Sequence, residues 1–173
     1  LYCDFFSTTS LSLREDFVKA LLKEIEGRAE ELRRARANTI YIGGGTPSQL
    51  DVRHLTEIFD ALQRVAPLQE GAEVTIECNP DDVTPEFVAA LKTTPVNRIS
   101  MGVQTFDDGL LRLLRRRHTP EQAHRAVDML REAGYSNISL DLMYGLPGQT
   151  MDMWKSDVEE MLSLHVPHLS AYS

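Results

Sequence analysis

Apolar residues along the chain recur at two alternating spacings, one typical of amphipathic helices and the other of buried strands. Between about residues 12 and 36 they follow the helical spacing, which predicts one long amphipathic helix. The β-rich run Thr39–Ile42 comes next and stops at the glycine-rich segment 43–47. A second helical pattern starts at Asp51, so the chain opens with a helix, a strand and another helix.

The same alternation continues to the end of the chain. Further strands are predicted at residues 74–77, 98–103, 138–144 and 169–172. Further helices are predicted after the N-caps Thr84 and Thr119, and from about residue 151 to residue 164. Such alternation implies parallel strands joined by right-handed crossovers. The predicted fold class is α/β with at least five parallel strands, closed as a barrel or open as a doubly wound sheet, and the pattern does not separate the two.

Polar or glycine-rich residues follow directly after four of the predicted strands. They occupy residues 43–46, 77–80, 104–106 and 144–147. In both parallel architectures the carboxyl ends of the strands gather the loops of every unit, and ligands bind there. We therefore expect the working site at this edge of the sheet, which we call the rim.

The segment Gly43-Gly44-Gly45-Thr46-Pro47 is the most distinctive local pattern. Three glycines after a buried strand let a ligand approach the bare backbone, and the proline stiffens the exit. The segment lacks the Gly-Lys-Ser/Thr ending of a P-loop and does not match Gly-x-Gly-x-x-Gly, which argues against a phosphate cradle. A tight turn without a ligand is the alternative.

Three polar side chains, Glu77, Gln104 and Asp141, fall at or close to the ends of predicted strands. Asp141 lies inside an apolar run, where a carboxylate has to face a polar space or a partner to avoid a large desolvation cost. Each of them alone could serve as a structural ion pair or a cap. Three on the same rim favour a binding site.

The run of arginines at 115–117 offers a further candidate. A guanidinium can bind a carboxylate through two hydrogen bonds, and Arg116 would suit this role. A run of charged residues is usually a solvated helix face, however, and the sequence pattern alone does not show which of the three arginines would bind a ligand. The histidines, including His54 and His118, lack metal-ligand spacing, and we expect surface or capping roles for them. Cys78 is expected to be a buried residue at a strand end.

Composition and charge exclude several classes of protein. The 173 residues are 42% hydrophobic and 25% charged, which predicts one soluble globular domain. The net charge of −8 argues against a nucleic-acid-binding surface, and no apolar stretch approaches the roughly 20 residues of a membrane helix.

A chain of this size needs no disulfide bond between Cys3 and Cys78 for its stability, so a reducing cytoplasm is expected. The absence of an initiator methionine and the strand-like run before Ser173 indicate a fragment.

Five segments in chain order resemble the oxygen-independent coproporphyrinogen III oxidase-like family of radical S-adenosylmethionine (SAM) proteins. They are residues 2–5 (YCDF), 41–48 (YIGGGTPS), 76–80 (IECNP), 100–106 (SMGVQTF) and 141–150 (DLMYGLPGQT). An unrelated α/β domain that binds a small anion at residues 43–46 would leave this ordered series unexplained. The resemblance implies that residues 1–173 form a radical SAM core domain, a partial (βα)6 barrel of the TIM type that lacks its first strand.

The resemblance also implies the cofactors. Members of the family hold a [4Fe–4S] cluster on a Cys-x-x-x-Cys-x-x-Cys loop, and Cys3 matches the third of these cysteines, so the first two would precede Leu1. The iron without a cysteine ligand binds SAM. Eight residues match the family's SAM contacts: Tyr2, Gly44, Gly45, Thr46, Glu77, Gln104, Arg116 and Asp141. The glycine segment would meet the methionine end of SAM and Arg116 its carboxylate, while no catalytic side chain is implied.

Phe5 bears on the branch of the family. The decarboxylating oxidases carry a further cysteine at this position, so Phe5 favours the branch of heme chaperones, which bind heme and deliver it to respiratory proteins. The alternative is a coproporphyrinogen III oxidase, which removes carboxyl groups from two propionates in porphyrin biosynthesis. The implied partners are heme or a porphyrin, a heme-accepting respiratory protein and an electron donor. Membrane association is expected only at the periphery and through a partner.

Overall fold

A computed structural model describes residues 11–34 and 37–173. The strands are β1 (Thr39–Ile42), β2 (Glu73–Cys78), β3 (Arg98–Gln104), β4 (Ile138–Met143) and β5 (His168–Tyr172). The helices are α1 (Arg14–Gly27), α2 (Ala29–Arg34), α3 (Val52–Val65), α4 (Pro85–Leu91), α5 (Asp108–Leu113), α6 (Pro120–Glu132) and α7 (Met151–Ser163). Single 3-10 turns occur at Leu11–Leu13, Pro47–Gln49 and Pro80–Asp82. Within the described residues, no helix is both long and apolar enough to cross a bilayer.

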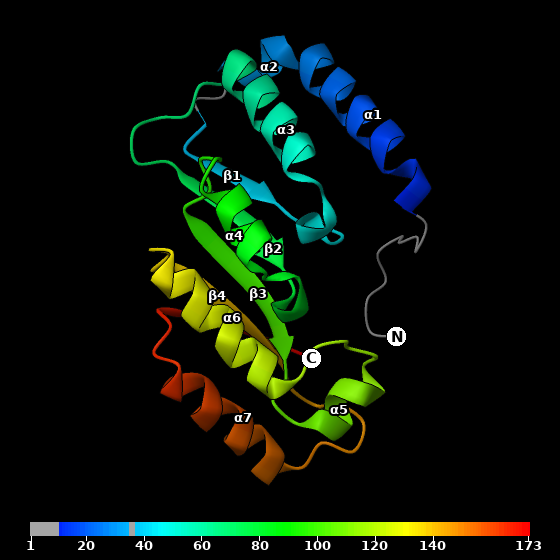
Figure 1. Cartoon of the computed structure of the whole chain (residues 1–173), viewed down its shortest axis with the longest axis vertical. Helices are drawn as coiled ribbons and strands as arrows, with labels where there is room; N and C mark the ends of the chain where they lie inside the picture. Colours follow the sequence, from blue (N-terminus) through cyan, green and yellow to red (C-terminus); the bar gives the residue numbers. More distant parts are fainter. Residues whose placement is uncertain (1–10, 35–36) are drawn as a thin grey trace.

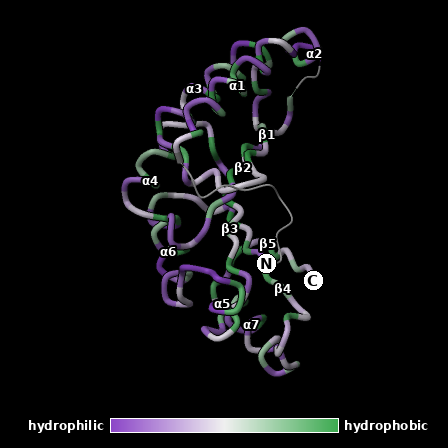
Figure 2. Tube along the Cα trace, turned by 90° about the vertical axis from the view of Figure 1, so that its right-hand side faces the viewer, coloured by the Kyte–Doolittle hydropathy of each residue, from purple (hydrophilic) through white to green (hydrophobic). Residues whose placement is uncertain are grey.

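The five strands are all parallel and lie side by side in chain order, from β1 to β5 (Figure 1). A right-handed crossover between neighbouring strands places its helix on one particular face, so a sheet wound without reversal carries its helices on the same face. Figure 2 shows α3, α4 and α6 together on one side of the strands. This is the order of a barrel wall, and it resolves the choice that the residue pattern left open, because a doubly wound sheet reverses its order at a switch point.

The face of the sheet that meets the helices is apolar. Its side chains in the three central strands include Ile76, Ile99, Met101, Leu140 and Leu142, each with 0% of its surface exposed. Successive residues of a strand point to opposite faces, so the residues between them line the other, concave face. These are polar: Thr75, Glu77, Ser100, Ser139 and Asp141. An ordinary TIM barrel fills this face with branched aliphatic side chains, so the polar lining here indicates an interior that binds a polar ligand.

The predicted strands agree with the observed ones to within one residue at every end, whereas one helix prediction was wrong and one helix was missed. The helix expected over about 12–36 is interrupted at Arg28, which separates α1 from α2. Gly27 directly precedes this break, and glycine is a poor helix former. Helix α5 was not predicted, because its six residues are too few to show a period, although Asp107 caps it by accepting a hydrogen bond from the Leu110 amide.

The predicted helix caps are confirmed. Thr84 accepts a hydrogen bond from the Phe87 amide at the start of α4. Thr119 forms a complete capping box with Gln122 at the start of α6, which satisfies two amides that a helix otherwise leaves without partners. These caps fix where each helix begins, and therefore where the preceding strand-to-helix loop crosses the rim.

Candidate functional site

The glycine segment after β1 combines one crowded position with two open ones. A Cβ atom at Gly43 would lie 2.6 Å from Cδ of Glu77 and 2.6 Å from Cε1 of Tyr41. A Cβ atom at Gly44 or Gly45 would meet nothing within 4 Å, and Gly44 has the left-handed φ of 98°. Gly43 therefore lets Glu77 pack against the chain, while the next two residues present bare backbone to the space above the rim.

Glu77 connects β2 to this segment. Its Oε1 accepts a hydrogen bond of 2.8 Å from the Tyr41 hydroxyl, and its Oε2 accepts one of 3.0 Å from the Gly44 amide. The carboxylate is thus held at both oxygens. Since a carboxylate oxygen has more than one lone pair, Glu77 keeps acceptor capacity for a cationic ligand.

Asp141 faces the same concave side from β4. Burial, and next to it the negative charge of Glu77, raise the pKa of Asp141 to about 6, against the opposing effects of Ser100, Arg98 and His168. Its Oδ2 accepts a hydrogen bond of 3.5 Å from the Ser100 hydroxyl. A carboxylate whose pKa is raised by a second carboxylate beside it forms a site that a positively charged group would stabilise.

Gln104 occupies a strained position at the end of β3. Its φ is 72°, in the left-handed region that residues other than glycine rarely adopt. A register shift precedes it, because Gly102 pairs with Asp141 whereas Gln104 pairs with Leu142. The side chain turns back over Gly102, where an added Cβ atom would lie 2.7 Å from its Nε2, and its Oε1 accepts a 2.7 Å hydrogen bond from the Tyr172 hydroxyl. The carboxamide is buried at the rim, with 4% of the residue exposed.

Arg116 is the arginine of the run 115–117 that reaches the rim. Its guanidinium donates to Oδ1 of Asn79 and to the carbonyl oxygen of Gly102, and so bridges the ends of β2 and β3. Arg117 instead forms an ion pair with Asp81 at 2.7 Å. The structure thus shows that Arg116 is the arginine at the rim, which the sequence pattern alone could not show.

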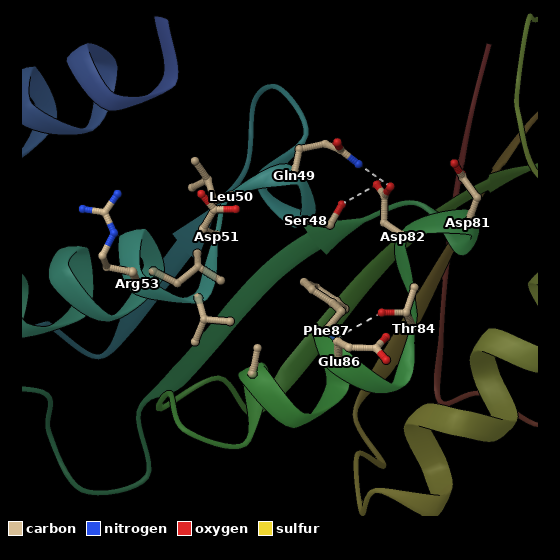
Figure 3. Close-up of a pocket in the computed structure, with 13 residues that line it drawn as sticks. Ser48, Gln49, Leu50, Asp51, Arg53, Asp81, Asp82, Thr84, Glu86 and Phe87 are labelled. Carbon is tan, nitrogen blue, oxygen red and sulfur yellow. Dashed lines mark hydrogen bonds between the residues drawn. The ribbon is translucent and has the colours of Figure 1, made fainter. Parts of the chain in front are cut away.

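Thr46 ends the glycine segment and remains exposed, and its carbonyl accepts a hydrogen bond from the Gln49 amide. Asp82 anchors the residues that follow, because it accepts hydrogen bonds from Ser48 at 2.7 Å and from the Gln49 side chain (Figure 3). An open groove of about 530 Å³ lies beside this anchor. None of the predicted SAM contacts lines it. Its lining residues Asp51, Asp81 and Asp82 already bind Arg14, Arg117 and Ser48, respectively, so we assign the site to the rim rather than to the groove.

Three buried polar residues were missed or misjudged. His118 is 3% exposed, not at the surface as expected, and its Nε2 lies 3.1 Å from the Val103 carbonyl oxygen. His54 is also buried, at 1% exposed, with Nε2 2.9 Å from Glu15. Asp157 of α7 is 2% exposed and binds residues 105–106 after β3. A signal for Asp157 exists in the sequence, since it shares the helical stripe of Trp154 and Met161.

The remaining assignments lie at the start of the chain. Tyr2, Cys3 and Phe5 are outside the described residues.

Across residues 11–34 and 37–173, no group of three or more His, Cys, Asp or Glu side chains could hold a metal ion. Cys78 is buried as predicted, and burial raises the pKa of its thiol, which keeps it protonated. The structure brings together Gly44, Gly45, Glu77, Gln104, Arg116 and Asp141 at the ends of four consecutive strands.

The raised pKa of Asp141 predicts a pH-dependent contribution to stability. Its pKa is about 6 in the fold against 3.8 for an ordinary aspartate, so the folded state retains the proton over this interval. The contribution is fully present below about pH 4 and is lost as the pH rises through about 6. We expect Asp141→Asn, which stays neutral, to gain free energy of unfolding relative to the wild type between pH 4 and pH 7. Urea unfolding at both pH values measures this gain, and the exposed Asp60→Asn is the control; a pH-independent difference for Asp141→Asn would contradict the assignment.

Comparisons with known proteins agree on the family. The sequence profile of the radical SAM superfamily matches residues 1–161. The heme chaperone HemW of Lactococcus lactis is 43% identical over 174 residues, and that of Bacillus subtilis 40% identical; each alignment covers 99% of this chain but only 45% and 46% of the relative. The chain thus spans about half the length of these curated relatives.

Solved structures give the same result for the fold. The structure of the radical SAM enzyme coproporphyrinogen III oxidase (HemN) from Escherichia coli superposes with a TM-score of 0.88 at 27% identity, over 99% of this chain and 40% of that one. The archaeal Elp3 of Methanocaldococcus infernus shares the fold with a TM-score of 0.71 at 22% identity, over 95% of this chain and 43% of that one. These similarities confirm the predicted partial barrel.

Proposed function

The chain belongs to the radical SAM superfamily, and on this premise we propose that it is part of a heme chaperone that binds SAM at its rim. The observation that carries the proposal is the similarity over 99% of the chain to proteins named heme chaperones, at 36% to 43% identity for three of them. Heme and a heme-accepting respiratory protein are the partners that follow from the proposal. An electron donor, and any membrane contact through the acceptor, belong to the same proposal.

The rim supports SAM as its ligand. SAM carries a sulfonium and an amine, and the mutually repelling carboxylates of Glu77 and Asp141 would be stabilised by such positive groups. Gly44 and Gly45 leave backbone groups open to the methionine end. Arg116 lies at the same edge as a partner for the carboxylate of SAM. The donor and acceptor types at the rim therefore fit the charged groups of this cofactor.

Cys3 would serve as one ligand of the [4Fe–4S] cluster, together with cysteines from the rest of the protein. When bound, the cluster and SAM supply one-electron chemistry that amino-acid side chains do not. The residues of this chain bind and orient SAM, and the polar concave face keeps acceptors and donors in reach of it. Tyr2 would lie close to Cys3 and contribute to the same end of the site.

A heme titration tests the proposed function. The intact protein, reconstituted anaerobically with iron and sulfide, is titrated with heme and followed by its absorbance; we expect saturation at a stoichiometric amount. Absence of stoichiometric heme binding would overturn the chaperone proposal. Incubation of the same preparation with coproporphyrinogen III and SAM tests the oxidase alternative, and formation of vinyl groups would establish the oxidase instead.

A further inference from the structure

At the end of β3, Gln104 has a left-handed backbone conformation, which residues other than glycine rarely adopt. Gln104 has a φ of 72° and follows the register shift between Gly102 and Gln104. A non-glycine residue in this region is strained, and it persists only where the surroundings fix it. Something beside β3 must therefore stabilise this backbone.

Three side chains from outside β3 form hydrogen bonds with the backbone on both sides of Gln104. The carbonyl oxygen of Gly102 accepts from Arg116, and that of Val103 accepts from Nε2 of His118 at 3.1 Å. On the far side, the amide of Phe106 donates to Oδ1 of Asp157 at 2.7 Å. The strained residue thus lies between two carbonyls and one amide that are each held by a side chain.

Asp157 accepts hydrogen bonds from several donors at once. Its two oxygens accept hydrogen bonds from the Thr105 hydroxyl at 3.1 and 2.9 Å, and Oδ2 also accepts from Nε2 of Gln149 at 3.4 Å. Gln149 in turn contacts the carbonyl of Met143 at the end of β4. A buried carboxylate that accepts from a backbone amide, a hydroxyl and an amide side chain ties α7 to the ends of both β3 and β4.

His118 acts as a neutral donor. Burial, and after it the charge of Arg116, lower the pKa of His118 to about 4, so the ring is uncharged near neutral pH. The carbonyl of Val103 can only accept, which assigns the ring proton to Nε2. Neither His118 nor Asp157 lies among the residues that match the family's SAM contacts.

We propose that Asp157 and His118 are positioning residues that hold the end of β3 so that Gln104 presents its carboxamide at the rim. They act on the ligand only through Gln104. This inference rests on the proposed binding of SAM at the rim, and it adds two residues that fix the geometry of that site.

The test is a double-mutant cycle on SAM affinity in the intact, anaerobically reconstituted protein. Asp157→Asn keeps the shape of the side chain but turns one acceptor into a donor that faces Gln149, which is itself a donor there. We expect about a tenfold loss of SAM affinity for Asp157→Asn, as for the loss of one good hydrogen bond. In a Gln104→Ala background the same change should cost less than about twofold, since the residue it positions is gone.

A control and a second pair of variants complete the design. Asp152→Asn on the same helix is 95% exposed at its side chain and should leave SAM affinity unchanged. His118→Gln retains a donor for Val103 and should keep most of the affinity, whereas His118→Phe keeps the ring but removes the donor and should lose it. This pair still decides the question if Asp157→Asn does not fold.

The outcomes separate the two proposals. Failure of the wild type to bind SAM would overturn the proposed function itself. If the wild type binds SAM and Gln104→Ala weakens it, equal losses from Asp157→Asn in both backgrounds, or no loss at all, would overturn the positioning role. Equal affinities of His118→Gln and His118→Phe would overturn the part assigned to His118.

Discussion

In the intact protein, Gln104→Ala and Asp141→Ala are each expected to weaken SAM binding by roughly 10- to 100-fold while the iron content stays within error of the wild type. A hydrogen bond to a charged group contributes about 1.5–3 kcal/mol, which corresponds to that range of affinity. Asp141 is the carboxylate that Glu77 repels, so a cation bound between them relieves the repulsion, and alanine removes that gain. Equilibrium dialysis with labelled SAM, alongside an iron assay, measures both quantities.

The two readouts distinguish a rim contact from general damage. Asp128→Ala on α6 and Gln69→Ala before β2 remove exposed side chains of the same kinds and should leave SAM affinity unchanged. A fall of iron content in step with SAM affinity would indicate that the variants disturb the cluster loop instead. Unaltered affinity in both Gln104→Ala and Asp141→Ala would remove these residues from the site.

Gly43→Ala is expected to lower the free energy of unfolding by about 1–3 kcal/mol, the usual cost of an added methyl group in a packed region. The new Cβ atom would lie 2.6 Å from both Cδ of Glu77 and Cε1 of Tyr41, so the carboxylate has to leave its place against the chain. Its hydrogen bonds to Tyr41 and to the Gly44 amide would then break. Urea unfolding monitored by circular dichroism measures the loss of stability.

Gly45→Ala is the matched control for this prediction. An added Cβ atom there meets nothing within 4 Å, and the backbone lies outside the left-handed region, so the free energy of unfolding should change little. The two substitutions add the same atom two residues apart in one loop. Equal stability of the two variants would show that Glu77 is not packed against Gly43 as described.

Much of the fold was predictable because its signals are local. A strand of alternating or continuous apolar residues followed by a capped helix identifies each unit. The single carboxylate in the run 138–143 already indicated that this side chain faces a polar space or a partner. The barrel-type strand order was not predictable from periodicity, because spacing along the chain does not specify which neighbours pair. The break at Arg28 and the six residues of α5 fall below the length at which a helical period can be read.

The site was only partly predictable for a different reason. Glu77, Gln104 and Asp141 stand out because polar side chains interrupt or end apolar strands. His118 carries no such contrast, since it lies among other polar residues, and Asp157 shows one only through the helical stripe that it shares with Trp154 and Met161. Choosing Arg116 from its run likewise required the tertiary position of Gly102, which no local pattern contains.

The strand order has a consequence for how the protein is made. Every strand pairs with the one synthesised just before it, and the links across the rim, such as Gly44 to Glu77, mostly join consecutive units. Each unit that leaves the ribosome therefore finds its docking surface already formed, without waiting for a distant partner. The pocket can be assembled in the direction of translation, one strand at a time.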